Sequence, residues 1–263
     1  MTRHRDPTGL FDTETDRVYA GNAMTEPEFR FDEAVARVFP DMIRRSVPGY
    51  TSIVPMIGVI AARYARPDTL CYDLGCSLGA ATLAMRHSVN QSGCRIIAVD
   101  NSESMIERCQ HYVALDDGAV PVELQCGDIQ AMAFDPASVV ALNFTLQFIP
   151  VAERLSLLQR LRQALQPGGA LILSEKIAFA DAREQQLMET LHHDFKRAHG
   201  YSDLEISRKR SALEQVLVPE TLQDHRRRLE EAGFEQVTLW HQSLNFISLL
   251  AIAPSDDHSL TTA

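Results

Sequence analysis

The sequence predicts an α/β protein built around an open, mostly parallel β-sheet. Between residues 68 and 174, short apolar runs alternate with segments of helical spacing, a pattern typical of strands joined by helices. Four of the apolar runs lead into a side chain that can hydrogen-bond a ligand: Asp73, Asp100, Asp128 and Asn143. Because the carboxyl ends of parallel strands meet at one edge of a sheet, we expect these side chains to surround a binding crevice.

Two helices are expected before the sheet. Helical spacing begins near Phe29, where Asp32 is available as a cap and Pro40 is expected to interrupt the helix. A second helix is predicted from Ile53 to Tyr64. We interpret these segments as an N-terminal helical brace, and we place Tyr50 in the loop between them.

The stretch from Leu70 to Ala80, LCYDLGCSLGA, predicts the first strand, a tight turn and the start of a helix. Its apolar residues fit a strand that is buried on both faces of a parallel sheet. Gly75 and Gly79 allow positive φ values and a close approach of backbone amides to a ligand. A turn of this type also occurs in α/β domains that bind nothing there, so by itself it does not decide the function.

The second strand, Arg95 to Asp100, ends in a carboxylate that can accept two hydrogen bonds from a ribose diol. The same acid can simply cap the following helix, in which Ser104 and Glu107 are spaced as a possible capping box. Both roles of Asp100 remain open at this point.

Three further strands complete the parallel part of the sheet, at Val122–Cys126, Ser138–Leu142 and Ala170–Ser174. The first leads into Gly127 and Asp128, whose carboxylate can accept from an exocyclic amine such as that of adenine. A helix over about 151–166 precedes the last strand and ends at Pro167-Gly168-Gly169. Near the C-terminus we expect one more helix and two strands, at Thr221–Ala232, Val237–Trp240 and Phe246–Ala253.

Composition limits the domain organisation and the class of protein. With 263 residues and 45% hydrophobic content, the chain can form a single domain over 28–255 with a helical insertion over about 177–220. We interpret 1–27 and 256–263 as flexible tails. The net charge of −10 argues against direct nucleic-acid binding. Without an apolar run of membrane-spanning length or a signal-peptide core, we expect a cytoplasmic protein with no membrane partner.

The turns and strand ends resemble those of the class I S-adenosyl-L-methionine (SAM)-dependent methyltransferases. The likeness rests on the Asp73 turn, the strand end at Asp100, Gly127-Asp128 and Pro167-Gly168-Gly169, and it spans roughly 68–253. It implies a Rossmann-like fold with a mostly parallel seven-stranded sheet and a C-terminal antiparallel hairpin. The superfamily pattern D-x-G-x-G-x-G has a glycine where this chain has Ser77, a residue small enough for the turn to survive.

Four motifs resemble the bacterial carboxy-S-adenosyl-L-methionine synthases more closely, over nearly the whole chain from about residue 28. They are RRSVPGY at 44–50, GCSLGAAT at 75–82, LNFTLQF at 142–148 and HHDFKRAHGYSDLEISRKRS at 192–211. The resemblance implies a transferase that converts SAM and prephenate into carboxy-SAM and phenylpyruvate. Carboxy-SAM is expected to co-purify and to supply a separate enzyme that modifies the wobble uridine of tRNA. A homodimer is also implied, and no metal is expected.

The same resemblance implies a set of site residues. The cofactor-binding positions are Tyr50, Gly75, Cys76, Ser77, Asp100, Asn101, Asp128, Ile129, Asn143 and Arg210. Tyr50 and Arg210 are expected to be catalytic, and the sequence leaves open whether Arg210 acts within its own subunit or across an interface. A guanidinium fork can pair bidentately with a carboxylate, which suits the substrate and the product of this reaction.

The other charged residues of the insertion have a simpler interpretation. A run of basic side chains is usually a solvated face, and we expect this of Lys196, Arg197, Arg208 and Lys209. His192 and His193 are interpreted as structural, because no carboxylate or cysteine partner lies at a useful spacing from either of them.

Two other function classes remain open. An ordinary methyltransferase acting on a small molecule would require a nucleophile-activating residue beside Asn143, where the sequence has Phe144 and Thr145. A non-catalytic SAM-binding protein is disfavoured by the basic insertion. Carboxylation of the SAM methyl group would instead need positioning, a dry pocket and cationic clamps rather than a strong catalytic base.

Overall fold

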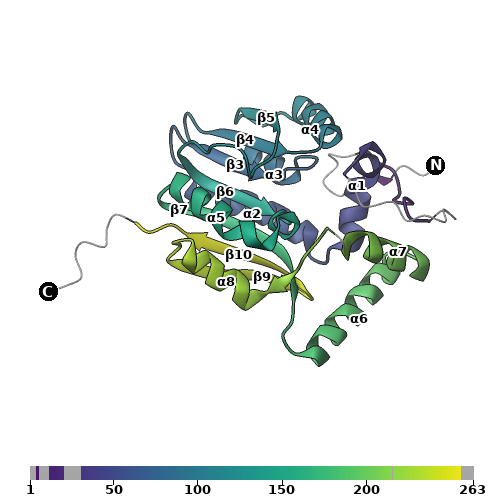
Figure 1. Cartoon of the computed structure of the whole chain (residues 1–263). Coiled ribbons are helices and arrows are strands. Elements are labelled where there is room, and N and C mark those ends of the chain that lie inside the picture. The colour runs from purple at the N-terminus through teal and green to yellow at the C-terminus, as the bar shows by residue number, and fades with distance from the viewer. Residues whose placement is uncertain (1–3, 6–11, 21–30, 215, 256–263) are drawn as a thin grey trace.

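The computed structural model describes residues 4–5, 12–20, 31–214 and 216–255, and an eight-stranded β-sheet runs through its centre (Figure 1). Seven strands follow one another in the order β5-β4-β3-β6-β7-β10-β9, and the short strand β8 pairs with β7 beside this path. The strands are β3 (Leu70–Leu74), β4 (Arg95–Asp100), β5 (Val122–Cys126), β6 (Ala137–Asn143), β7 (Leu165–Ala178), β8 (Glu220–Thr221), β9 (Gln236–Ser243) and β10 (Phe246–Ile252). A separate pair, β1 (His4–Arg5) and β2 (Asp12–Thr13), is antiparallel.

The sheet confirms the predicted topology. Strands β5, β4, β3, β6 and β7 are parallel, whereas β10 pairs antiparallel with both β7 and β9. The two-residue strand β8 is an addition to the seven predicted strands. After β5 the chain returns to the other side of β3 to form β6, so the strand order reverses between β3 and β6. A reversal of this kind opens a crevice at the carboxyl ends of the two strands.

Helices cover both faces of the sheet (Figure 1). They are α1 (Glu33–Ser46), α2 (Tyr50–Tyr64), α3 (Ala80–Ser88), α4 (Glu103–Leu115), α5 (Val151–Ala164), α6 (Ala182–Ala198), α7 (Asp203–Glu214) and α8 (Leu222–Glu231). Apolar side chains of α2 and α3 form one core with the sheet, and those of α5 and α8 form another on the opposite face. Among the described residues, no helix combines the length and the apolar character needed to span a bilayer.

The predicted helical insertion is confirmed and consists of α6 and α7, between β7 and β8. Figure 1 shows α6 extending away from the sheet and α7 returning toward α1. Arg45 of α1 donates from Nε to the carbonyl of His199 at 2.6 Å, and its guanidinium lies 3.9 Å from the ring centre of Tyr201. These contacts fix the insertion against the N-terminal helices, so the insertion forms one wall of the crevice.

Part of the expected N-terminal tail is folded onto the domain. Asp16 and Tyr19 are buried, and the amide of Asp16 donates to Oδ2 of Asp41 at 2.7 Å. The expectation of a flexible tail is therefore wrong for 12–20. Other parts of the expected tails lie outside the described residues, at 1–3, 6–11, 21–27 and 256–263.

Both N-terminal helices differ from the expectation. Helix α1 continues through Pro40, because buried Val35, Val38 and Met42 hold one face of the helix in the core on both sides of the proline. Helix α2 begins at Tyr50, so the prediction that Tyr50 lies in a loop is wrong.

Two boundaries further along the chain also differ. The helix predicted over 151–166 ends at Ala164, and β7 begins at Leu165. Pro167-Gly168-Gly169 therefore forms an irregular start of the strand, where Gly168 has a φ of 69°. Helix α4 is capped by Ser102, whose Oγ accepts from the amide of Met105 at 3.2 Å.

Candidate functional site

A cavity of about 610 Å³ lies at the carboxyl ends of the parallel strands. Its walls come from the ends of β3, β4, β6 and β7 and from α1, α2, α6 and α7. The ten residues predicted as site positions all line it: Tyr50, Gly75, Cys76, Ser77, Asp100, Asn101, Asp128, Ile129, Asn143 and Arg210. The structure therefore brings together residues that are separated by up to 160 positions in the sequence.

The turn after β3 is shaped by close contacts with neighbouring strands. Gly75 has a φ of 78°, and a Cβ atom there would lie 2.3 Å from Oγ1 of Thr145. The amides of Gly75 and Cys76 both donate to the carbonyl of Val99, at 2.8 and 2.9 Å. These two amide groups are therefore bound to β4 and do not face a ligand, contrary to the expectation from the glycine pattern.

Ser77 replaces the expected glycine with a left-handed backbone, at a φ of 51°. This conformation is uncommon for residues other than glycine. The amide of Ser77 donates to Oδ2 of Asp100 at 2.9 Å, and this bond holds the turn against the end of β4. The turn survives the substitution, as the sequence predicts.

Asp100 is fixed in place by two backbone amides. Its Oδ2 accepts from Ser77 and its Oδ1 accepts from Ser102, both at 2.9 Å. Burial raises the pKa of this carboxyl group, and the two amides oppose that shift by stabilising the charged form. Because Ser102 caps α4, Asp100 is not needed as the cap. Each of its oxygens can accept a further hydrogen bond from the cavity.

Asp73 has a structural role. It is buried, and its Oδ2 accepts from the hydroxyl of Thr82 at 2.6 Å, which joins β3 to α3. Burial raises the pKa of Asp73 to about 6, while the Thr82 hydroxyl opposes the rise. Of the four polar strand ends, this one is committed to the fold.

Asn143 ends β6 beside the turn. Its Oδ1 is buried and has no hydrogen-bond partner within the described part of the chain. The next residue, Phe144, has a φ of 63°, a strained value for a bulky side chain. A buried carbonyl oxygen costs free energy unless a donor reaches it, so this position fits an amine-bearing ligand such as SAM.

The end of β5, which leads into Asp128, is open to solvent. Asp128 is exposed, and its Oδ1 accepts from the amide of Gln130 at 2.9 Å. A Cβ atom on Gly127 would meet nothing within 4 Å, so there is free space next to this turn. Ile129 is buried and continues the apolar wall of the cavity.

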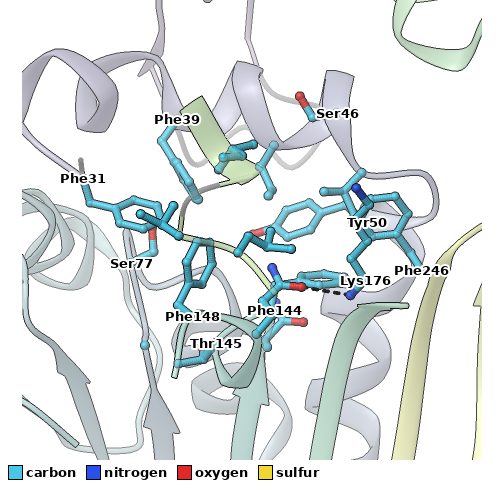
Figure 2. A pocket seen from close by; sticks show the side chains of 18 of the residues that line it. Phe31, Phe39, Ser46, Tyr50, Ser77, Phe144, Thr145, Phe148, Lys176 and Phe246 are labelled. Atoms are coloured by element: carbon cyan, nitrogen blue, oxygen red, sulfur yellow. Dashed lines mark hydrogen bonds between the residues drawn. The ribbon is translucent and has the colours of Figure 1, made fainter. Parts of the chain in front are cut away.

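Aromatic side chains form much of the remaining wall, and sequence reasoning missed most of them. Figure 2 shows Tyr50 reaching into the cavity beside Phe144 and Phe246. The ring centres of Tyr50 and Phe144 are 6.4 Å apart, and those of Phe144 and Phe246 are 6.0 Å apart. A second group consists of Phe31, Phe39 and Phe148. These rings make part of the cavity wall apolar.

Gly49 decides where Tyr50 lies. It has a φ of 83°, and a Cβ atom there would lie 2.4 Å from Nε2 of His241. The carbonyl of Gly49 accepts from the amides of Ser52 and Ile53, both at 2.9 Å, so α2 starts directly after it. Tyr50 is therefore held in a helical turn at the edge of the cavity.

Basic residues line the cavity where the insertion meets the end of β7. Lys176, Lys196, Lys209 and Arg210 line the cavity. The relative exposure of Lys196 is 7% and that of Lys209 is 4%, so the expected solvated face is wrong for both. The expectation is confirmed for Arg197, which is exposed and pairs with Asp194 and Asp203.

Lys209 has several partners. Its Nζ lies 3.0 Å from Oγ of Ser46 and 3.4 Å from both the hydroxyl of Tyr201 and Oδ2 of Asp16. Tyr201 also donates to Asp16. Burial lowers the pKa of Lys209 to about 8, and Asp16 opposes the shift. This cluster could not be expected from a sequence in which Asp16 belongs to an apparent tail.

His192 agrees with the structural role predicted for it. Its Nε2 lies 2.8 Å from the carbonyl of Ser46, and its ring packs edge-on against Phe246. Burial, aided by the charge of Lys196, lowers the pKa of His192 to about 2. The imidazole is therefore neutral, with Nε2 as the donor to Ser46.

The chain is similar to one described protein family and, over most of its length, to several individual proteins. The family described as "Methyltransferase domain" matches residues 72–169. Carboxy-S-adenosyl-L-methionine synthase from Marinobacter nauticus is 61% identical over 241 residues, covering 92% of this chain and 96% of the relative. The protein of the same name from Trichlorobacter lovleyi is 60% identical over 239 residues, covering 90% and 98%.

Solved structures show the same fold at low sequence identity. Human N-acetylserotonin methyltransferase in complex with SAM has a TM-score of 0.59 at 17% identity, covering 85% of this chain and 56% of the human chain. A putative SAM-dependent methyltransferase from Methanococcus maripaludis has a TM-score of 0.54 at 20% identity, covering 89% and 99%. These likenesses confirm the predicted Rossmann-like methyltransferase fold.

Proposed function

The chain belongs to the carboxy-S-adenosyl-L-methionine synthase family, and we propose that it converts SAM and prephenate into carboxy-SAM, phenylpyruvate and water. One observation carries the proposal: a single cavity joins a SAM-type cradle to a cationic wall. Asp100 and Asn143 offer acceptors for a ribose diol and an amine. Lys196 and Arg210 face the same space, and their charges suit a second substrate with two carboxylates.

The proposed reaction balances without an external base. The ring carboxylate of prephenate leaves as carbon dioxide, and its electron pair aromatises the ring as the hydroxyl departs. The hydroxide removes one proton from the methyl group on the sulfonium and becomes water. The resulting carbanion forms a carbon–carbon bond with the carbon dioxide. The protein's task is therefore to hold the two substrates in contact and to retain carbon dioxide until it reacts.

The described residues suit that task. The rings around Tyr50 and Phe144 make the cavity apolar where carbon dioxide must be kept, and Asp100 is fixed in advance by two amides. Arg210 lies on α7 at the cavity wall, where its guanidinium can pair with a carboxylate. We propose catalytic roles for Tyr50 and Arg210, and cofactor contacts for the strand-end residues.

The wider setting is also proposed from the family. The product would pass to a separate tRNA-modifying enzyme in the cytoplasm, and the net charge of −10 fits a protein that does not grip nucleic acid itself. A homodimer is supported by exposed leucines on the insertion. These are Leu187 and Leu191, one helical turn apart on α6, and Leu204 on α7.

Incubation of the purified protein with SAM and prephenate tests the proposed reaction. We expect a cofactor heavier by one carbon dioxide, together with an equal amount of phenylpyruvate, measured by mass spectrometry. Prephenate labelled in its ring carboxylate should transfer the label, and labelled bicarbonate should not, because the apolar cavity retains the carbon dioxide. S-adenosylhomocysteine formed in step with an added acceptor would indicate a methyltransferase. Absence of turnover would indicate a binding protein.

Replacing Arg210 with lysine tests the carboxylate clamp. Lysine keeps the charge but loses the planar fork, so we expect the preference for carboxy-SAM over SAM to fall about tenfold while SAM still binds. Competitive calorimetric titration of the two compounds gives this ratio. Arg208→Lys is the matched control, because Arg208 lies on the same helix and donates to the carbonyl of Tyr19 instead of lining the cavity. An unchanged ratio in Arg210→Lys would rule out the clamp.

A further inference from the structure

Lysine is scarce in this chain, and every lysine lines the same cavity. Only three of the 25 basic residues are lysines, and they are Lys176, Lys196 and Lys209. They come from three different elements, β7, α6 and α7. All other basic positions are arginine. An ammonium group is compact and can lose its proton when it is buried, whereas a guanidinium is bulky and always charged. Lysine therefore occurs in this chain only at positions that line the cavity.

Among the described residues, no acidic side chain forms an ion pair with Lys196 that would offset the cost of burying its charge. Its exposure is 7%, and within the described residues its Nζ makes no hydrogen bond or ion pair. Lys209, in contrast, has Ser46, Tyr201 and Asp16 as partners. Burial, aided by the neighbouring charges of Lys209, Lys176 and Arg210, lowers the pKa of Lys196 to about 7. These three neighbouring groups are all cations.

A buried cation that has no ion-pair partner and lies beside other cations is unfavourable in the free protein. The same arrangement becomes favourable when an anion enters, because one carboxylate can accept from several donors at once. Lys196 lines the cavity, so an incoming ligand can reach it. The basic wall is therefore organised for an anionic ligand and not for the stability of the fold.

On the basis of the proposed function, we propose that Lys196 binds the carboxylate that prephenate keeps in phenylpyruvate, with Lys176 and Arg210 beside it. The other carboxylate leaves as carbon dioxide and loses its charge in the transition state. A cation bound to that group would stabilise the substrate more than the transition state and would slow the reaction. The strongest cationic contact is therefore useful at the carboxylate that is retained.

The test uses Lys196→Met, which keeps the length of the side chain, with Arg197→Met as the matched control. Arg197 is the next residue of α6 and loses the same charge, but it is exposed and pairs with Asp194 and Asp203. Calorimetric titration with phenylpyruvate in the presence of SAM should show an affinity about 10- to 100-fold lower in Lys196→Met and unchanged in Arg197→Met. The KM for prephenate should rise in parallel, while the affinity for SAM stays within about twofold, because the cradle is intact.

Thermal denaturation separates this role from a structural one. Removal of an unpaired buried charge should raise the Tm of free Lys196→Met above that of the parent protein. If Lys196 only supported the fold, the Tm would fall and the affinity for phenylpyruvate would be unchanged. Either of those results would overturn the proposal. A parent protein that forms no carboxy-SAM overturns the proposed function as well, whereas carboxy-SAM formation with an unchanged KM in Lys196→Met overturns only this inference.

The pH dependence of phenylpyruvate binding gives an independent readout. The charged groups around Lys196 are Lys176 on β7, Glu189 and His193 on α6, and Lys209 and Arg210 on α7. In the free protein, Lys196 loses its proton as the pH rises through about 7. A bound carboxylate stabilises the ammonium form, so Lys196 stays protonated to higher pH in the complex. Affinity should therefore fall above pH 7, by at most about tenfold per pH unit. In Lys196→Arg only the weaker dependence from Lys209, whose pKa is about 8, should remain; an identical profile in parent and variant would contradict the proposal.

Discussion

Replacing Gly75 with alanine is expected to destabilise the protein by about 3 kcal/mol and to abolish measurable SAM binding. The backbone at Gly75 has a φ of 78°, a left-handed value that alanine disfavours. The new Cβ atom would also lie 2.3 Å from Oγ1 and 2.5 Å from Cγ2 of Thr145. Thr145 cannot easily yield, since its hydroxyl donates to the carbonyl of Leu74 at 2.8 Å. The turn and the adjacent end of β6 should therefore move apart.

Thermal denaturation and calorimetric titration with SAM measure these effects. A loss of about 3 kcal/mol corresponds to a decrease in Tm of roughly 6–12 °C for a domain of this size. Gly127→Ala is the control for stability, because a Cβ atom there meets nothing within 4 Å. A Gly75→Ala protein with the Tm and SAM affinity of the parent would show that the close approach to Thr145 does not shape the site.

The sheet and the polar strand ends could be predicted because their signals are local. The central strands β3, β4, β6 and β7 each contain an apolar run, and Asp73, Asp100 and Asn143 lie at or beside the ends of such runs, so these signals do not depend on distant contacts. Asp100 and Asn143 are in the cavity for this reason. Only the structure decides between the possible roles of these acids: Ser102 caps α4 and leaves Asp100 to the cavity, whereas Asp73 is bound by Thr82.

The basic wall could not be predicted because its environment is made by contacts across the whole chain. Lys209 meets Asp16, which is 193 positions away, and a polar N-terminal segment gives no sign of such a contact. Lys196 lies one residue from exposed Arg197, so its burial depends on which side of α6 packs against α1 and α7. General residue frequencies favour solvent exposure for both lysines, and tertiary packing overrides them.

The position of Tyr50 also depends on a contact between residues that are distant in the sequence. Whether α2 starts at Tyr50 or at Ile53 depends on the left-handed backbone of Gly49, and the side chain of His241 on β9 leaves no room for a Cβ atom there. The contact joins segments that are nearly two hundred residues apart in the sequence. A helix boundary fixed by such a contact cannot be derived from local spacing.

Replacing Asp100 with alanine is expected to lower the affinity for SAM by about 1.5–3 kcal/mol, or roughly 10- to 150-fold. The carboxylate is the proposed acceptor for the ribose diol, and its loss leaves those hydroxyls without a charged partner. The substitution also frees the amides of Ser77 and Ser102, which both donate to Asp100 in the parent. We therefore expect a lower Tm as well, together with a weaker hold on the turn that contains Ser77.

Two measurements distinguish the loss of the ribose contact from the loss of the turn. Calorimetry should show weaker binding of both SAM and adenosine to Asp100→Ala, because the two ligands share the ribose. Methionine, which lacks the ribose, should compete for the site as well as it does in the parent protein. The control is Asp117→Ala, which removes an exposed acid outside the cavity wall. If Asp100→Ala bound adenosine as tightly as the parent, Asp100 would act only through the turn, and the ribose would have to be recognised elsewhere in the cavity.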